Sequence, residues 1–453
     1  MEDDLSTLPA YIKDSRLLFE TWLSRLVAIP TVSSDPAHDP DITKGVASAV
    51  RLLETFGLST TVVETGGNPI VVGTLLQDPA YSTILVYNHM DVQPASGEWG
   101  TDPFILTRRG NDYIGRGATD DKGPALTVLF AIKYARSRRI PLNFKVVWEF
   151  EEEIGSPHFD EFVKTHRKEL AAESVVVSDT VWLSDDKPVL SIGLRGLLTF
   201  ELYLQTGVTD VHSGMAGGPT RNPIAELAQI ICECYDAKSG HVHISGFYDG
   251  VRPVSSDELQ TLRTSGFSVQ KFMQDLQLFS LRSQEPIEVQ QSIMLRPTFE
   301  VHSIAGGYTG TGIKTVIPSS ATAKLSVRLV PDQRPTETFQ KIKRFIQNRN
   351  PDITVRRQNS CEPYLAKLDG PYLKAAEIAT HYAFAAQPAL VREGGSIGSV
   401  MSMSAHLQVP ILLLGISLPK HGYHAPNEHF DWQQAAGGIK LFAKYFSEIA
   451  KIS

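Results

Sequence analysis

Residues 82–94, STILVYNHMDVQP, give the clearest indication of the fold class. Its continuous apolar and β-branched run predicts a buried strand of an α/β sheet. His89 and Asp91 follow with Met90 between them, so both side chains are expected to face the same side of the strand end. A histidine placed in this way can bind a metal while a neighbouring carboxylate orients its ring. Taken alone, however, the pattern is more often a solvated strand end.

Similar runs surround this stretch and alternate with helical patterns at residues 122–139 and 158–170, after an amphipathic opening helix at 11–29. The runs are TTVVE (60–64), PIVVGTLL (69–76), NFKVVWEFE (143–151), SVVVSD (174–179) and, near the C-terminus, VPILLLG (409–415). Strands that alternate with helices predict an α/β domain whose mixed sheet carries helices on both faces.

The pattern changes near residue 195, where the long strand GLLTFELYLQT (196–206) precedes a Gly-rich turn and a predicted helix at 222–236. A second long strand, ATAKLSVRLVP (321–331), is followed by a predicted helix at 336–348. This order predicts a smaller α+β domain at 195–369, inserted into a larger domain formed by 1–194 and 370–453.

The composition is that of an ordinary globular protein, with 453 residues and 42% hydrophobic content. The net charge of -7, spread along the chain, argues against a nucleic-acid partner. The first residues lack the basic and then apolar plan of a secretory signal, and no apolar run is long enough to span a membrane. We therefore expect a cytoplasmic protein without a membrane partner, whose three cysteines are reduced.

Further acidic and histidine-rich segments end strands or open turns. Asp120 and Asp121 lie in the glycine-bracketed turn GRGATDDKG, and Asp179 ends a predicted strand. Three acids, Glu151, Glu152 and Glu153, directly follow another strand, and the loop KHGYHAPNEHF carries His421, His424, Glu428 and His429. If the strand continues through the three acids, Glu152 and Glu153 point in opposite directions and differ in role. Each segment alone also fits helix capping or solvated charge.

The charge of such a cluster indicates what it must bind. Two carboxylates about 4 Å apart repel each other by roughly 4 kcal/mol at an effective dielectric constant near 20. Asp120, Glu152, Glu153 and Asp179 can therefore converge in ionised form only around cations. Histidine and carboxylate ligands without a thiolate favour zinc, with cobalt or manganese as replacements.

With these segments in place, the chain resembles the co-catalytic dinuclear zinc metallopeptidases. That family includes carnosine and cytosolic nonspecific dipeptidases, aminoacylases, glutamate carboxypeptidase and succinyl-diaminopimelate desuccinylase, and the likeness is strongest to the dipeptidase branch. It runs through HMDVQPA, GRGATDDKGP, EEIGS, SDTVWL, HSGMAGG, KTVIP, SVRLVP, REGGSI and HAPNE, in the order of the family. The resemblance implies a catalytic domain of the zinc-exopeptidase type and an inserted lid and dimerisation domain.

The resemblance also implies that five residues hold two zinc ions per subunit, which manganese or cobalt could replace. Asp120 would bridge both ions. His89 and Asp179 would complete one ion, and Glu153 and His424 the other.

The same resemblance implies the catalytic roles. Glu152 would be the general base that produces a metal-bridging hydroxide, which attacks the scissile amide. Asp91 would orient His89, Asp121 would be a supporting residue, and the peptide bond after Asp120 would be cis.

For the substrate, the resemblance implies that Arg328 pairs with a terminal carboxylate, because its planar guanidinium matches that group. Thr315 and Ser396 match positions that contact the substrate in the dipeptidases. His212 would stabilise the oxyanion from the partner subunit, so a homodimer is expected.

Two other functions remain open at this point. An N-acyl-amino-acid hydrolase or a carboxypeptidase would use the same ions and base, and Arg328 fits those enzymes equally well. A catalytically inactive scaffold would be expected to lack a ligand or the base, yet all six residues are present. Asn88 and Gly398 stand where relatives often carry glycine and proline, which leaves the exact substrate open.

Overall fold

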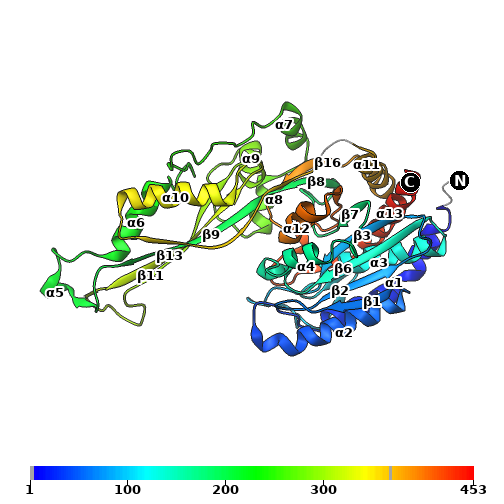
Figure 1. Cartoon of the computed structure of the whole chain (residues 1–453), viewed down its shortest axis with the longest axis horizontal. Coiled ribbons are helices and arrows are strands. Elements are labelled where there is room, and N and C mark those ends of the chain that lie inside the picture. The colour runs from blue at the N-terminus through cyan, green and yellow to red at the C-terminus, as the bar shows by residue number, and fades with distance from the viewer. Residues whose placement is uncertain (1–4, 367–369, 453) are drawn as a thin grey trace.

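The computed structural model describes residues 5–366 and 370–452 (Figure 1). Its larger sheet has the strand order β1-β2-β6-β3-β7-β17-β8-β15, with β16 paired to β8. These strands are β1 (Ser59–Val63), β2 (Ile70–Leu75), β3 (Ser82–His89), β6 (Leu142–Glu149), β7 (Ser174–Val177), β8 (Val189–Leu194), β15 (Tyr364–Leu365), β16 (Ala389–Glu393) and β17 (Ile411–Leu413). Strands β6, β3, β7 and β17 run parallel, so their carboxyl ends meet at one edge of the sheet.

Helices cover both faces of this sheet. Along β3, Ile84 and Val86 pack into one core, whereas Leu85 and Tyr87 pack into the other, as the two-residue period of a strand requires. The first core lies under α1 (Leu8–Val27), α2 (Asp39–Thr55), α3 (Lys122–Ser137), α11 (Pro371–Phe384) and α13 (Trp432–Ile449), and the second under α4 (Phe159–Thr165) and α12 (Gly398–Leu407). This arrangement confirms the predicted α/β class with a mixed sheet.

A second sheet of four antiparallel strands extends away from the first (Figure 1). Its order is β11-β13-β9-β14, from β9 (Gly196–Gln205), β11 (Thr298–Gly306), β13 (Ser320–Leu329) and β14 (Thr354–Cys361). Side chains of α6 (Pro223–Cys234) and α10 (Pro335–Arg349) share a buried core with these strands. At the far tip, β10 (Val211–His212) pairs with β12 (Val316–Ile317) next to α5 (Ser213–Ala216).

Three helices that the sequence patterns did not predict lie in the polar segment before β11. They are α7 (Ser256–Arg263), α8 (Val269–Asp275) and α9 (Pro286–Met294). Leu262 of α7 and Met294 of α9 share a core with Trp182 and with Val391 of β16, so this segment packs on the larger sheet. The division into a larger domain (1–194 and 370–453) and a smaller inserted domain (195–369) stays a prediction. Its second boundary adjoins residues 367–369, which lie outside the described residues.

A sheet of three short strands connects the loop that carries His424 to the segment before Asp120. Strand β18 (His429–Asp431) pairs with β5 (Asp112–Ile114), which pairs with β4 (Thr107–Arg109). The loop before β18 therefore lies next to the turn after β5. Within residues 5–366 and 370–452, no helix has the length and apolar character that crossing a bilayer requires.

Candidate active site

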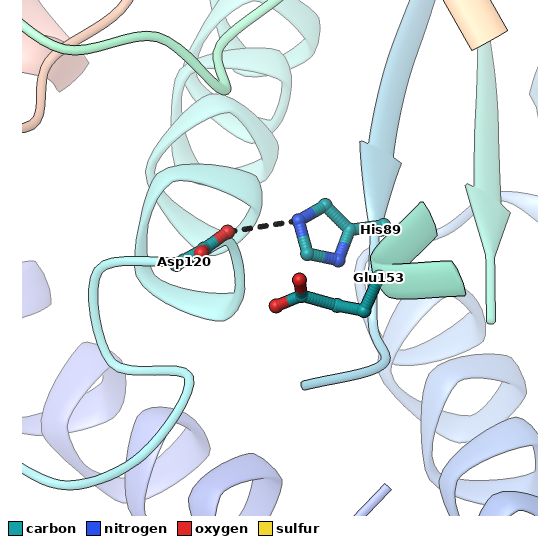
Figure 2. A group of neighbouring side chains, drawn as sticks. All are labelled: His89, Asp120 and Glu153. Atoms are coloured by element: carbon teal, nitrogen blue, oxygen red, sulfur yellow. Dashed lines mark hydrogen bonds and ion pairs between the residues drawn. The ribbon is translucent and has the colours of Figure 1, made fainter. Parts of the chain in front are cut away.

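Polar side chains gather where the parallel strands of the large sheet end. His89 is the last residue of β3, and Glu153 lies in η2 (Glu152–Ile154), a short 3-10 helix that follows β6. Asp120 lies in the turn before α3. Figure 2 shows these three side chains pointing toward one another from three different elements, and their ligand atoms lie within 4.8 Å of one another.

Asp120 faces two histidines with its two carboxylate oxygens. Its Oδ1 lies 3.0 Å from His89 Nε2, and its Oδ2 lies 2.9 Å from His424 Nε2. Burial alone would raise the pKa of Asp120, but the hydrogen bonds from His424 and His89 hold it below the ordinary value. The peptide bond from Asp120 to Asp121 is cis, as predicted. A carboxylate shared in this way is suited to bridge two cations.

The remaining predicted ligands lie on either side of Asp120. Glu153 Oε2 is 3.2 Å from His424 Nε2, and Asp179 Oδ2 is 3.7 Å from His89 Nε2. The structure thus brings all five residues together, in two groups that share Asp120. Their binding to metal stays a prediction.

The carboxylate of Asp91 holds several parts of this cluster in place. Its Oδ1 lies 3.3 Å from His89 Nδ1, on the side of the ring opposite Asp120. The same carboxylate accepts hydrogen bonds from the backbone amides of Glu152, at 3.2 Å, and Glu153, at 3.0 Å. It also accepts from Ser33 Oγ at 2.7 Å. Asp91 therefore orients both the His89 ring and the turn that carries the two glutamates.

The geometry of this acidic turn corrects one expectation. Strand β6 ends at Glu149, so Glu152 and Glu153 do not alternate along a strand but follow each other in η2. Burial raises the pKa of Glu152 well above its ordinary value, and the negative charges of Asp179 and Glu153 raise it further, against an opposing effect of His89. A carboxyl group with a raised pKa is suited to accept a proton from water and to release it again.

The donor set fits divalent cations. Burial, together with the negative charge of Asp120, raises the pKa of Asp179 to about 7. Buried carboxylates that repel one another in this way remain ionised near neutral pH when cations lie between them. Two histidines and three carboxylates, without a sulfur ligand, match zinc and also suit manganese or cobalt.

Asp121, which follows Asp120 in the same turn, contacts the end of β3. Its Oδ2 accepts a hydrogen bond of 2.7 Å from Asn88 Nδ2, which also donates to Ser178 Oγ at 2.7 Å. Burial raises the pKa of Asp121 well above its ordinary value. Asn88, one of the departures from the family pattern, therefore ties β3 to the turn of Asp120.

Glu428 fixes the same turn from the C-terminal loop, a role that the sequence patterns did not reveal. Its carboxylate accepts hydrogen bonds from the backbone amides of Gly117, at 3.0 Å, Thr119, at 3.0 Å, and Asp120, at 3.1 Å. It also pairs with Arg116 Nη1 at 2.7 Å, and both side chains are almost fully buried. This buried ion pair joins two segments that are about 300 residues apart in sequence.

We expect Glu428→Ala to lower the free energy of unfolding by about 3–5 kcal/mol, because it leaves the buried charge of Arg116 without a carboxylate partner. Chemical denaturation followed by circular dichroism would measure this change. The control is Glu161→Ala, which removes an exposed ion pair with Lys164 and is expected to change stability little. Equal stabilities of the two variants would contradict the role of Glu428.

The four predicted substrate residues form two separate pairs. Arg328 Nη1 donates to Ser396 Oγ at 2.8 Å, where β13 meets the larger sheet. Thr315 Oγ1 lies 3.5 Å from His212 Nε2, at the tip near α5. Figure 1 shows that this tip is at the opposite end of the molecule from the helices that cover the larger sheet. The chain does not bring His212 to its own metal cluster.

Two further side chains contact the predicted ligands. Tyr423 donates to Asp179 Oδ1 at 3.4 Å, and Gln93 Nε2 donates to Glu153 Oε2 at 2.8 Å. Both lie within segments that the sequence analysis quoted, Tyr423 next to His424 and Gln93 two residues after Asp91. Ser33, in contrast, lies in a segment that carries no such signal.

Comparison with known families identifies the chain. A model of peptidase family M20/M25/M40 matches residues 85–448, which span the metal cluster and the second sheet. The chain belongs to this family. The predicted resemblance is therefore confirmed, and this M20 peptidase is a peptide-bond hydrolase.

Several relatives of the M20 peptidase have names that state an activity. The chain is 31% identical to the Cys-Gly metallodipeptidase of Schizosaccharomyces pombe over the full length of both proteins. It is 28% identical to the human Beta-Ala-His dipeptidase, covering 96% of the chain and 90% of that protein. Among solved structures, the dipeptidase Dug1p of Saccharomyces cerevisiae has a TM-score of 0.88 at 26% identity, covering 100% and 99% of the two chains. A metallo-carboxypeptidase of Sulfolobus solfataricus has a TM-score of 0.87 at 28% identity, covering 95% and 98%.

Proposed function

We propose that this M20 peptidase hydrolyses dipeptides with the help of two divalent metal ions per subunit, with zinc as the native metal. The observation that carries this proposal is the carboxylate of Asp120, whose two oxygens face His89 and His424 at 3.0 and 2.9 Å. Asp179 on one side and Glu153 on the other complete the two groups.

In the proposed mechanism, the residues of the chain position the substrate and move one proton. Bound ions would polarise the scissile carbonyl and lower the pKa of water. Glu152 takes the proton from the attacking water and later delivers it to the leaving amine. Arg328 and Ser396, already joined by a hydrogen bond, hold the terminal carboxylate of the dipeptide.

We also propose that the M20 peptidase is a homodimer in which His212 and Thr315 reach the active site of the partner. Support comes from the tip that carries this pair, because Val208, Met215 and Ile313 expose apolar side chains there. Exposed apolar groups that cluster on one surface commonly mark an interface. A cytoplasmic location stays a prediction.

Dipeptides are favoured over N-acyl amino acids as substrates because the full-length relatives at 28–31% identity are named as dipeptidases. We expect a chelator to abolish hydrolysis and added zinc, manganese or cobalt to restore it. Among matched substrates, a dipeptide is expected to be cleaved about tenfold faster than the corresponding N-acetyl amino acid. Chromatography of the released amino acids would measure both rates. Faster cleavage of the N-acetyl amino acid would instead support an acylase.

A further inference from the structure

A pocket of about 330 Å³ opens beside the candidate metal centre. This volume is at the lower end of the range of ligand sites, so a bulky side chain fits within it. Its wall is largely apolar and comes from both the larger sheet and the segment of α8 and α9. The apolar lining residues include Trp182, Phe267, Phe272, Leu276, Ile293, Met294 and Leu418.

The pocket reaches the loop that carries His424. Gly422, Tyr423 and Ala425 line it, and the hydroxyl of Tyr423 lies 3.4 Å from the predicted metal ligand Asp179. A substrate bound at the metal centre would therefore be close enough to place a side chain in the pocket.

The same pocket is connected to the predicted carboxylate site by one segment of chain. Glu393 and Gly394 line the pocket, and Ser396, which binds Arg328, lies two residues after Gly394. The backbone bends at Gly394 and Gly395, so Glu393 and Ser396 lie at most roughly 10 Å apart, the reach of three extended residues. A dipeptide with its carboxylate at Arg328 can therefore place its N-terminal residue at the pocket.

The charged groups at the pocket wall already have partners. Lys271 pairs with Asp275 at 3.0 Å and with Asp185 at 3.5 Å. Glu393 accepts a hydrogen bond from Ser191. No cation among the residues that line this pocket is therefore left to attract an acidic side chain, and the apolar wall favours an uncharged one.

We propose that this pocket is the subsite for the side chain of the N-terminal residue, and that it selects bulky apolar side chains such as leucine, methionine and phenylalanine. The inference rests on the proposed dipeptidase function and adds the substrate class. Burial of such a side chain in an apolar pocket is worth about ten- to a hundredfold in kcat/KM.

The test compares the kcat/KM of the metal-loaded protein for Gly-Ala, Leu-Ala, Phe-Ala, Asp-Ala and Lys-Ala. Leu-Ala and Phe-Ala are expected to exceed Gly-Ala and both charged substrates by about tenfold or more. Equal values for Gly-Ala and Leu-Ala, or a preference for Lys-Ala or Asp-Ala, would overturn the pocket inference but leave the dipeptidase function intact. Absence of hydrolysis for every dipeptide would instead overturn the proposed function, and the pocket inference with it.

Two variants connect this preference to the pocket. Phe272→Ala removes part of the wall, and Ile293→Trp fills the space with a larger side chain. Each is expected to lower kcat/KM for Leu-Ala about tenfold while changing that for Gly-Ala less than about twofold. The matched control is Phe279→Ala, because Phe279 is fully exposed and does not line the pocket. If Phe279→Ala has the same effect, or if neither pocket variant changes the ratio, the assignment is wrong.

A binding measurement separates this effect from catalysis. In a Glu152→Gln background, calorimetry with Leu-Ala is expected to give a Kd about tenfold lower than with Gly-Ala, and Phe272→Ala is expected to remove the difference. Equal Kd values for the two dipeptides in this background would contradict the pocket as a binding site.

Discussion

Glu152→Gln is expected to lower kcat by about two to four powers of ten while the protein keeps its metal ions, because general base catalysis usually contributes this much. Glutamine has nearly the same shape, but it cannot accept a proton at neutral pH. The backbone amide of residue 152 would still donate to Asp91, so the turn should persist. Metal content by mass spectrometry and steady-state kinetics would measure the two effects separately.

The adjacent glutamate provides a matched control for this experiment. Glu151 is also buried, but its carboxylate is bound to His158 Nδ1 at 2.7 Å and to the backbone amide of Asn68 at 3.0 Å. Glu151→Gln should therefore change kcat little. Near-normal turnover of Glu152→Gln would mean that another group takes the proton, whereas loss of metal would mean that Glu152 supports the ligands.

Much of the larger sheet could be predicted from sequence because its central strands are continuous β-branched runs. The segment of α7, α8 and α9 could not, since these helices are short and polar and are held by contacts with distant residues such as Trp182. Contacts with a distant residue also explain why the predicted strand alternation of Glu152 and Glu153 was wrong. The strand pattern extends through the acids, but the backbone turns after Glu149 into a 3-10 helix whose amides bind Asp91.

The candidate site was predictable where each residue ends a strand or lies in a glycine-bracketed turn. His89, Asp120 and Asp179 are of this kind, because the carboxyl ends of parallel strands converge. The supporting pair of Glu428 and Arg116 was not, since it is buried and joins segments about 300 residues apart that no local pattern connects. The separation of His212 from the metal cluster likewise depends on the direction in which the second sheet extends from the larger one, and a single sequence does not show that direction.

His212→Ala is expected to lower kcat by about two to three powers of ten, the usual effect of removing one group that stabilises an oxyanion. His243→Ala is the matched control, because His243 is also an exposed histidine within residues 195–369 but belongs to neither predicted pair. It should leave kcat unchanged. Light scattering of the purified protein would establish whether the M20 peptidase is a dimer.

A heterodimer of the two impaired chains tests whether His212 acts across the interface. His212→Ala and Glu152→Gln chains carry different tags, are produced together and are purified through both tags. In a symmetric dimer, one of the two sites would then combine an intact Glu152 with an intact His212 from the partner. Activity should rise to about half that of the wild type, far above either parent homodimer. If His212 served its own chain, both sites of the heterodimer would stay impaired, and the placement of His212 at the tip would need another explanation.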